Sequence, residues 1–211
     1  MPTPNPSRVR EGGNSMWTAI IPFNYGRPCK TRLAPVLSVE ERDALAMAMA
    51  LHVVGVVGQV PAIDSAHLLA PVDPILPGAQ WLRDDGRGIN SELAAARAAS
   101  PGQPILIIHA DLPLLAPSDV ETLLRAAAVS GAAIAPDAAG RGTNAIALAD
   151  DRAFVPAFGA DSLAAHRSAL PGAPLVDTPG LTLDVDDADS LHHAAQRGFV
   201  LPRGMRIAPS I

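Results

Sequence analysis

Short apolar runs alternate with helical stretches along this chain. The clearest run is Ile-Leu-Ile-Ile at residues 105–108, with turn-forming prolines and a glycine before it and Pro113 after it. A short run of β-branched residues and leucine between turn residues predicts a strand that is buried on both faces. Such strands are typical of parallel sheets that are covered by helices.

The same pattern predicts the remaining elements. Further strands are expected at residues 17–21, 65–70, 80–82, 132–135, 143–148 and 181–185. Helices are expected at residues 38–58, 89–99, 118–129, 161–170 and 189–197, two of them beginning with capping boxes, at Ser38 and at Ser118. Strands that alternate with helices predict right-handed βαβ units and a mostly parallel sheet. The expected fold class is therefore single-domain α/β, with three layers arranged α/β/α.

Composition limits the classes of function. The chain has 211 residues, of which 48% are hydrophobic and only 3% aromatic, so one globular core is built mainly from aliphatic residues. A formal charge of −5 with no basic run argues against nucleic-acid binding. No run is long enough for a membrane span, and the single cysteine, Cys29, fits a cytoplasmic setting. Residues 1–15 are polar and predict a disordered tail, which leaves residues 16–211 as the domain.

Acidic residues follow two of the predicted strands. Asp111 comes directly after the buried run, and Asp184 and Asp186 lie two apart in an extended segment, so their side chains point the same way. Open α/β sheets bind ligands at the carboxyl ends of their strands, and carboxylates beside substrate phosphates are usual ligands of Mg²⁺. The pattern favours a magnesium site. The alternative is that the acids cap the following helices, which is the expected role of Asp189.

Basic and glycine-rich loops supply candidate contacts for phosphate. Lys30 and Arg32 lie between the first strand and the helix that begins at Ser38, where backbone N–H groups and the helix dipole favour an anion. Residues 140–144 and 158–162 could also direct N–H groups at an anion. None of these segments is a P-loop. The alternatives are a solvated basic loop and an ordinary connection between strands.

The other reactive side chains do not form a recognisable site. His192 and His193 are adjacent and cannot share one helix face, so a zinc site is not expected. Cys29 has no base near it in sequence, which leaves thiol catalysis unsupported. His109 lies on the central strand and is expected to be a core residue or to support the site.

Several blocks of sequence occur in the order known from one family and cover about residues 17–198. The blocks are residues 21–23, 30–35, 37–42, 86–93, 110–115, 142–145, 158–166 and 183–186. Together they resemble the guanylyltransferases of coenzyme F420 biosynthesis, which act on 2-phospho-L-lactate or phosphoenolpyruvate. The resemblance implies a nucleotide-diphospho-sugar transferase (GT-A-like) fold. It also implies transfer of GMP from GTP to a small phosphorylated acid (phosphoenolpyruvate, 2-phospho-L-lactate or 3-phosphoglycerate), with Mg²⁺ as cofactor and pyrophosphate as leaving group.

The resemblance also implies roles for particular residues. Mg²⁺ would be held by Asp111, Asp184 and Asp186. The nucleotide would be contacted by Lys30, Arg32, Gly88, Asn90 and Asp111, of which Lys30, Arg32 and Asp111 would be catalytic. The phosphorylated acid would be held by Thr143, Asn144, Gly159 and Ser162.

Two positions depart from the family pattern. Relatives often have lysine where Asn24 stands, and glycine where Arg141 stands. The first change would weaken the expected phosphate contacts, and Arg141 would either replace the lost contact or change the acid that is accepted. Two alternatives stay open, namely another nucleotidyl- or glycosyltransferase of the same fold and a non-catalytic nucleotide-binding relative. A homodimer is compatible with the resemblance, although no interface is visible in the sequence.

Overall fold

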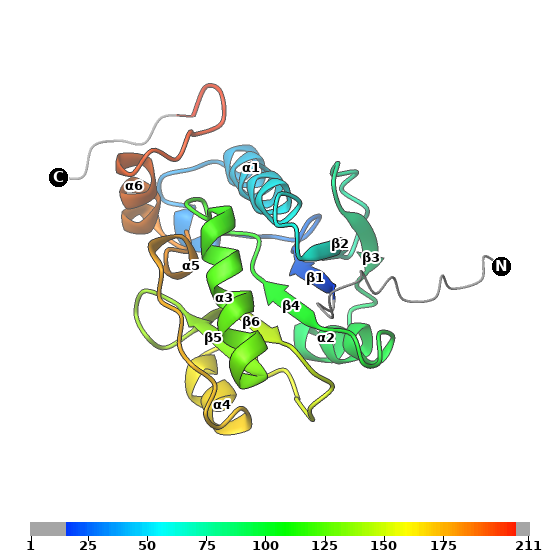
Figure 1. Cartoon of the computed structure of the whole chain (residues 1–211). Helices are drawn as coiled ribbons and strands as arrows, with labels where there is room; N and C mark the ends of the chain where they lie inside the picture. The colour runs from blue at the N-terminus through cyan, green and yellow to red at the C-terminus, as the bar shows by residue number, and fades with distance from the viewer. Residues whose placement is uncertain (1–15, 206–211) are drawn as a thin grey trace.

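One six-stranded sheet forms the centre of the structure (Figure 1). The computed structural model describes residues 16–205, so the expected tail at residues 1–15 lies outside the described residues. The strands are β1 (Trp17–Pro22), β2 (Ile63–Ala70), β3 (Gln80–Arg83), β4 (Ile105–Ile108), β5 (Ala132–Pro136) and β6 (Thr143–Leu148). Their order across the sheet is β3-β2-β1-β4-β6-β5. β6 runs in the direction opposite to the other five strands, which confirms a mostly parallel sheet.

Helices cover both faces of this sheet and confirm the three-layer fold. They are η1 (Thr31–Leu33), α1 (Val39–Val57), α2 (Ile89–Ala98), α3 (Pro117–Ser130), α4 (Ser162–Ala169), α5 (Pro179–Thr182) and α6 (Ala188–Gln196). α1 and α3 pack on one face and α2 and α4 on the other, with α3 crossing the front of the sheet in Figure 1. Within residues 16–205, no helix has the length and apolar character needed to cross a membrane.

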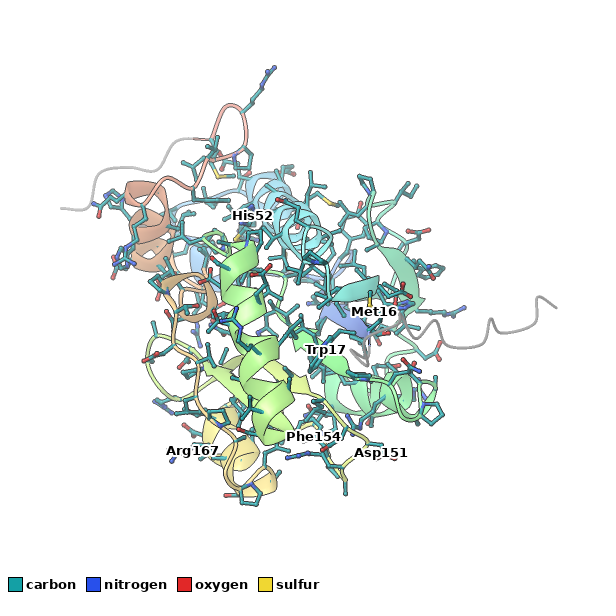
Figure 2. All side chains as sticks on the ribbon, in the orientation of Figure 1. Met16, Trp17, His52, Asp151, Phe154 and Arg167 are labelled. Atoms are coloured by element: carbon teal, nitrogen blue, oxygen red, sulfur yellow. The ribbon has the colours of Figure 1, made fainter. Side chains whose placement is uncertain are left out.

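The position of β4 inside the sheet explains why its sequence is apolar throughout. Leu106 and Ile108 face the cluster under α1 and α3, whereas Ile105 and Ile107 face the cluster over α2 and α4. All four are buried. Side chains fill both spaces between helices and sheet (Figure 2). Because a central strand has no solvent face, each of its side chains contributes about 1.5–3 kcal/mol by leaving water.

The strand that was expected at residues 181–185 does not form, and that prediction was wrong. The single-turn helix α5 ends at Thr182, and residues 183–186 continue as an extended segment outside the sheet. Pro179 starts this helix with the backbone angle that a first turn requires. Asn144 Nδ2 then donates to the Leu181 and Thr182 carbonyls at 2.9 and 3.1 Å, so these groups need no strand partner.

Helix starts were predicted with mixed success. The capping box at Ser38 is present and begins α1, as expected. The start expected at Ser118 was wrong, because Pro117 occupies the first helical position and Ala116 is the N-cap. α6 is capped by Asp187, whose carboxylate accepts from Ser190 N at 2.9 Å, rather than by Asp189.

The direction of β6 determines which residues reach the functional edge of the sheet. The carboxyl ends of β1, β2 and β4 lie at one edge because these strands are parallel. β6 is antiparallel to β4, with Ala145 opposite Ile108, so its first residues, Thr143 and Asn144, lie at that same edge. The glycine-rich segment 140–142 is therefore the turn of the β5–β6 hairpin, which was the structural alternative for these glycines.

Candidate functional site

A cavity of about 520 Å³ opens at the carboxyl edge of the sheet. Its walls come from the loop after β1, the segment from the end of β3 to the start of α2, and the residues that follow β4. Polar side chains that line it include Asn24, Arg27, Lys30, Asp84, Glu92, His109, Asp111 and Asp186. A cavity of this size with a few convergent polar groups is the usual form of a small-molecule site.

Lys30 lies at the centre of the charged part of this cavity. Its Nζ is 2.5 Å from Asp111 Oδ2 and 3.0 Å from Asp186 Oδ1, and its side chain is only 11% exposed. Burial by itself would lower the pKa of Lys30, but the two carboxylates more than offset this and hold it above its ordinary value. Asp111 is affected in the opposite sense, since burial raises its pKa and Lys30 lowers it, with a net decrease. The ion pair is therefore fully charged at neutral pH.

Asp184 differs from the two carboxylates that pair with Lys30. Burial, followed by the negative charges of Asp111 and Asp186, raises the pKa of Asp184 to about 6. Its Oδ1 lies 3.4 Å from Asn144 Nδ2. A backbone bond of 3.2 Å from Val185 N to the Asp111 carbonyl holds the 183–186 segment against the end of β4. The structure thus brings together the three acids that the sequence singled out.

The donor chemistry of this cluster fits a hard divalent cation only in part. Oδ1 of Asp111 is buried without a hydrogen-bond partner among the described residues, and the negative charges of Asp111 and Asp186 add to the effect of burial in raising the pKa of Asp184. However, the ammonium of Lys30 already lies between Asp111 and Asp186. Within residues 16–205, no three acidic, histidine or cysteine side chains are arranged to hold a metal ion. A cation would have to compete with Lys30, and a magnesium site stays a prediction.

The other predicted phosphate contact is less enclosed. The side chain of Arg32 is 75% exposed and lies 3.8 Å from Asp186. Arg27, which the sequence analysis did not single out, forms a 2.8 Å ion pair with Asp84 between the loop after β1 and the loop after β3. Asn24 lines the cavity, and its amide makes only a 3.5 Å contact with the Pro28 carbonyl. The position where relatives often have lysine therefore faces the site.

The predicted nucleotide contacts at the start of α2 have structural partners. Gly88 is the N-cap of α2 and has a φ of 90°, which only glycine adopts readily. Asn90 uses both ends of its amide on one residue, because Oδ1 accepts from Phe158 N at 2.7 Å and Nδ2 donates to Phe158 O at 3.0 Å. Neither Gly88 nor Asn90 is among the residues that line the cavity. In this structure Asn90 joins α2 to the 158–162 segment.

Glu92 is a buried cavity residue that the sequence analysis missed. Its carboxylate accepts from the backbone N, Nε and Nη2 of Arg87 at 3.0, 3.1 and 2.7 Å. These bonds lower the pKa of Glu92 to about 2, so it remains charged. No local pattern marks a glutamate on the buried side of α2. Only an arginine five residues earlier in the chain indicates a partner.

The four residues expected to hold the phosphorylated acid lie at the start of β6 and in the 158–162 segment. Thr143, Asn144 and Ser162 are buried, and Gly159 has a φ of 134°. None of the four lines the cavity. His109, which lines the cavity, is in tilted contact with the ring of Phe158, and the two ring centroids are 5.3 Å apart. Nearby, Arg141 pairs with Asp161 at 2.9 Å and links the hairpin turn to the start of α4.

His109 lines the cavity and is more than a core residue. Its Nε2 is buried and has no hydrogen-bond partner among the described residues. Its backbone N donates to the Asn144 carbonyl at 2.9 Å, which extends the pairing of β4 and β6 by one step. Burial is the main reason that its pKa is lowered. In the sequence, only its position two residues before Asp111 indicated that His109 lies near the site.

A mostly parallel sheet with a cavity at its carboxyl edge is the usual arrangement of a ligand-binding α/β protein, and solved transferases share this fold. The chain is similar to a protein from Desulfovibrio desulfuricans G20 assigned as a nucleotide-diphospho-sugar transferase, with a TM-score of 0.65 and 19% identity over 84% of this chain and 85% of that one. It is also similar to a nucleotidyl transferase from Methanothermobacter, with a TM-score of 0.55 and 16% identity over 87% and 99% of the two chains. These similarities confirm the expected fold.

The sequence identifies the family within this class. The family model described as "Guanylyl transferase CofC like" matches residues 17–193, and the chain belongs to that family. A phosphoenolpyruvate guanylyltransferase from Streptomyces coelicolor is 33% identical over 91% of this chain and 95% of its own length. Another from Nocardia farcinica is 35% identical over 80% of each chain. The chain is thus a nucleotidyltransferase of the guanylyltransferase kind, as the resemblance implied.

Proposed function

We propose that this enzyme transfers GMP from GTP to a small phosphorylated acid and releases pyrophosphate, as a step of coenzyme F420 biosynthesis. Phosphoenolpyruvate is the first acceptor to test, because the similar relatives carry its name. 2-Phospho-L-lactate and 3-phosphoglycerate are the other acceptors of this chemical class. The observation that carries the proposal is the cluster formed by Lys30, Asp111 and Asp186 inside the cavity.

The chemistry needs charge neutralisation more than it needs a base. A phosphate oxygen of the acid would attack the α-phosphorus of GTP, forming a new P–O–P link, while the bond to pyrophosphate breaks. Because the attacking oxygen is already an anion, no proton has to be removed. What limits such a reaction is the approach of two anions and their alignment. This explains why the cavity holds ionic side chains in place of a triad.

The charged residues have complementary parts in this proposal. Lys30 would use its ammonium to neutralise phosphate charge at the carboxyl edge of the sheet, while the exposed Arg32 would contact the outer phosphates. A bound magnesium ion, held by Asp111, Asp184 and Asp186, would supply further neutralisation of the triphosphate. Burial of one carboxylate oxygen of Asp111 and the ion pair of the other with Lys30 restrict the direction in which this side chain points.

The direct test is pyrophosphate release from GTP with Mg²⁺ in the presence of each acid. The next enzyme of the pathway should be present to trap the product. We expect release with one acid, none without acid, and little with CTP or UTP. Equal release with CTP or UTP would favour another nucleotidyltransferase. GTP binding without release for any acid would favour a non-catalytic nucleotide binder.

A matched pair of variants connects the activity to the cavity. Asp111→Asn keeps the shape of the side chain but removes the charge that pairs with Lys30, and activity should fall by about 10³-fold or more. Asp64→Asn is the control, because Asp64 is exposed near the start of β2, away from the cavity. It should keep full activity. Full activity in a folded Asp111→Asn variant would contradict the assignment.

A further inference from the structure

A buried histidine connects the segment before α4 to the start of β6. His166 lies on α4, which packs beneath β5 and β6 (Figure 1), and its side chain is 0% exposed. Its Nε2 lies 3.1 Å from the backbone N of Ala157. Its Nδ1 lies 2.9 Å from the hydroxyl oxygen of Thr143 at the start of β6. Both ring nitrogens therefore have partners.

These two contacts determine which nitrogen carries the proton. A backbone N–H can only donate, so Nε2 of His166 must accept from Ala157 and must be unprotonated. The proton of the neutral ring is then on Nδ1, and Nδ1–H donates to Thr143. Burial, with a smaller contribution from His109, lowers the pKa of His166 to about 4, so the ring is neutral at physiological pH.

The tautomer of His166 determines what the Thr143 hydroxyl can do. Because this oxygen accepts from His166, its own O–H must point elsewhere and can donate. Among residues 16–205, His166 is the only hydrogen-bond partner of that hydroxyl. Thr143 lies at the functional edge, next to Asn144, whose carbonyl accepts from the backbone N of His109. A directed hydroxyl donor next to the site is suited to an anion.

We propose that His166 is a positioning residue for the acceptor acid, because it holds the Thr143 hydroxyl as a hydrogen-bond donor toward the acid's phosphate or carboxylate. This inference rests on the proposed function and adds a residue to the acceptor site. His166 does not touch the acid and acts through Thr143. Ring contacts support its placement, since His166 packs edge-on against Phe158 at 4.7 Å and Phe158 packs against the cavity residue His109.

Two conservative variants separate positioning from simple structural support. His166→Asn places an amide N–H where Nδ1–H was, so it keeps the bond to Thr143 and loses the bond to Ala157. His166→Gln reaches to the Nε2 position, so it keeps the bond to Ala157 and loses the bond to Thr143. We expect the Gln variant to raise KM for the acid about tenfold, with KM for GTP unchanged, because one hydrogen bond to an anion is weakened. The Asn variant should stay within about twofold of the parent.

A double variant tests whether the effect passes through Thr143. Thr143→Val removes the hydroxyl and keeps the shape, and it should raise KM for the acid by itself. Adding His166→Gln to Thr143→Val should then change this KM no further. Additive effects, or a larger effect for His166→Asn than for His166→Gln at equal thermal stability, would overturn the proposal.

A spectroscopic measurement distinguishes failure of this inference from failure of the proposed function. ¹⁵N chemical shifts of the two ring nitrogens report the tautomer of His166 without any turnover. We expect a protonated Nδ1 and an unprotonated Nε2 near pH 7.5, retained when Thr143 is changed to Ser. A protonated Nε2 would overturn the inference even if the enzyme uses GTP and an acid as proposed. With Nδ1 protonated, lack of turnover with every acid would contradict the proposed function, and the inference that depends on it would then fall too.

Discussion

Two neighbouring regions at the carboxyl edge of the sheet hold their side chains by different means. In the first, which we call the ionic region, Lys30 is held between the charges of Asp111 and Asp186. In the second, which we call the neutral region, Asn144 and His166 are buried and held mainly by hydrogen bonds to uncharged groups. Ionic contacts can be exchanged for a charged ligand, whereas buried neutral hydrogen bonds maintain one geometry. The first region suits a triphosphate, and the second suits the orientation of a small acid.

The local backbone supports this distinction. Lys30 precedes η1 in the left-handed conformation, with a φ of 49°, which is unusual for a residue other than glycine. It is also the only lysine in the sequence. A compact ammonium with three donors can contact two carboxylates and still turn toward phosphate, which the planar guanidinium of arginine does less easily. The ionic region is therefore built on a loop, and the neutral region on β6 and α4.

The largest effect is expected from removing the charge at the centre of the ionic region. Lys30→Met should lower kcat/KM by about 10²–10³-fold, because an ammonium that neutralises phosphate is lost. It should also destabilise the protein by about 3 kcal/mol, since the half-buried carboxylate of Asp111 loses the ammonium that balances its charge. Steady-state kinetics and urea unfolding measure the two effects.

The control for that variant keeps the charge and changes the shape. Lys30→Arg should retain most of the stability but not the full activity. If Lys30→Met were as stable as the parent, the ionic region would not depend on the ion pair, and the contrast between the two regions would fail.

In the neutral region, a change of charge should act mainly on stability. Asn144→Asp preserves the shape of the side chain but replaces a donor with an acceptor opposite the Leu181 and Thr182 carbonyls. We expect a loss of about 2–3 kcal/mol, measured by urea unfolding, because buried acceptors are left unpaired beside a new charge. Asn24→Asp is the matched control, since the Asn24 amide makes only an exposed 3.5 Å contact, and it should cost less than about 0.5 kcal/mol.

Asp184, which adjoins the ionic region, and His166, in the neutral region, should respond to pH in opposite directions. The pKa of Asp184 is raised from 3.8 to about 6, so the folded state binds this proton more tightly than the unfolded state does. The contribution of Asp184 to stability is therefore lost as pH rises through that range. The pKa of His166 is lowered from 6.5 to about 4, so the unfolded state binds its proton more tightly and stability is gained as pH rises through that range.

Differences between variants and parent isolate these contributions. The free energy of unfolding of metal-free Asp184→Asn, taken relative to that of the parent, should rise by about 1 kcal/mol as pH rises from about 4 to about 7. This value is reduced because the carboxyl of Asp184 is partly exposed. His166→Asn should lose about 1–2 kcal/mol over the same interval. Unfolding measured across this range checks both. Difference curves that run in the same direction would contradict the assignment of a charged and a neutral region.

Local patterns predicted most of the fold but only part of the site. The buried run of β4 and the capping box of α1 depend on neighbouring residues and were predicted correctly. The 181–185 segment was misassigned because a short apolar run fits a strand and a single-turn helix equally well, and the deciding partner, Asn144, lies 37 residues from Leu181.

Contacts in the site connect residues that are even farther apart. Lys30 reaches Asp111 across 81 residues and Asp186 across 156, and no spacing rule in the sequence describes such a pair. The sequence placed these residues at the same end of the sheet because each follows or precedes a predicted element. It could not show that Lys30 itself would occupy the position between the carboxylates. It also could not show that Asn90 would bind the Phe158 backbone.

The smallest effect is expected at the outer edge of the ionic region. Arg32→Gln should change the free energy of unfolding by less than about 0.5 kcal/mol, because its contact with Asp186 is 3.8 Å long and its side chain is 75% exposed. If Arg32 contacts the outer phosphates as proposed, KM for GTP should still rise about threefold at low salt, and the difference should shrink as salt is added. Arg125→Gln, at an exposed position of α3 that does not line the cavity, is the control and should leave KM unchanged. A salt-independent loss for Arg32→Gln would mean that this arginine shapes the loop and does not contact phosphate, which would restrict the ionic region to Lys30 and its carboxylates.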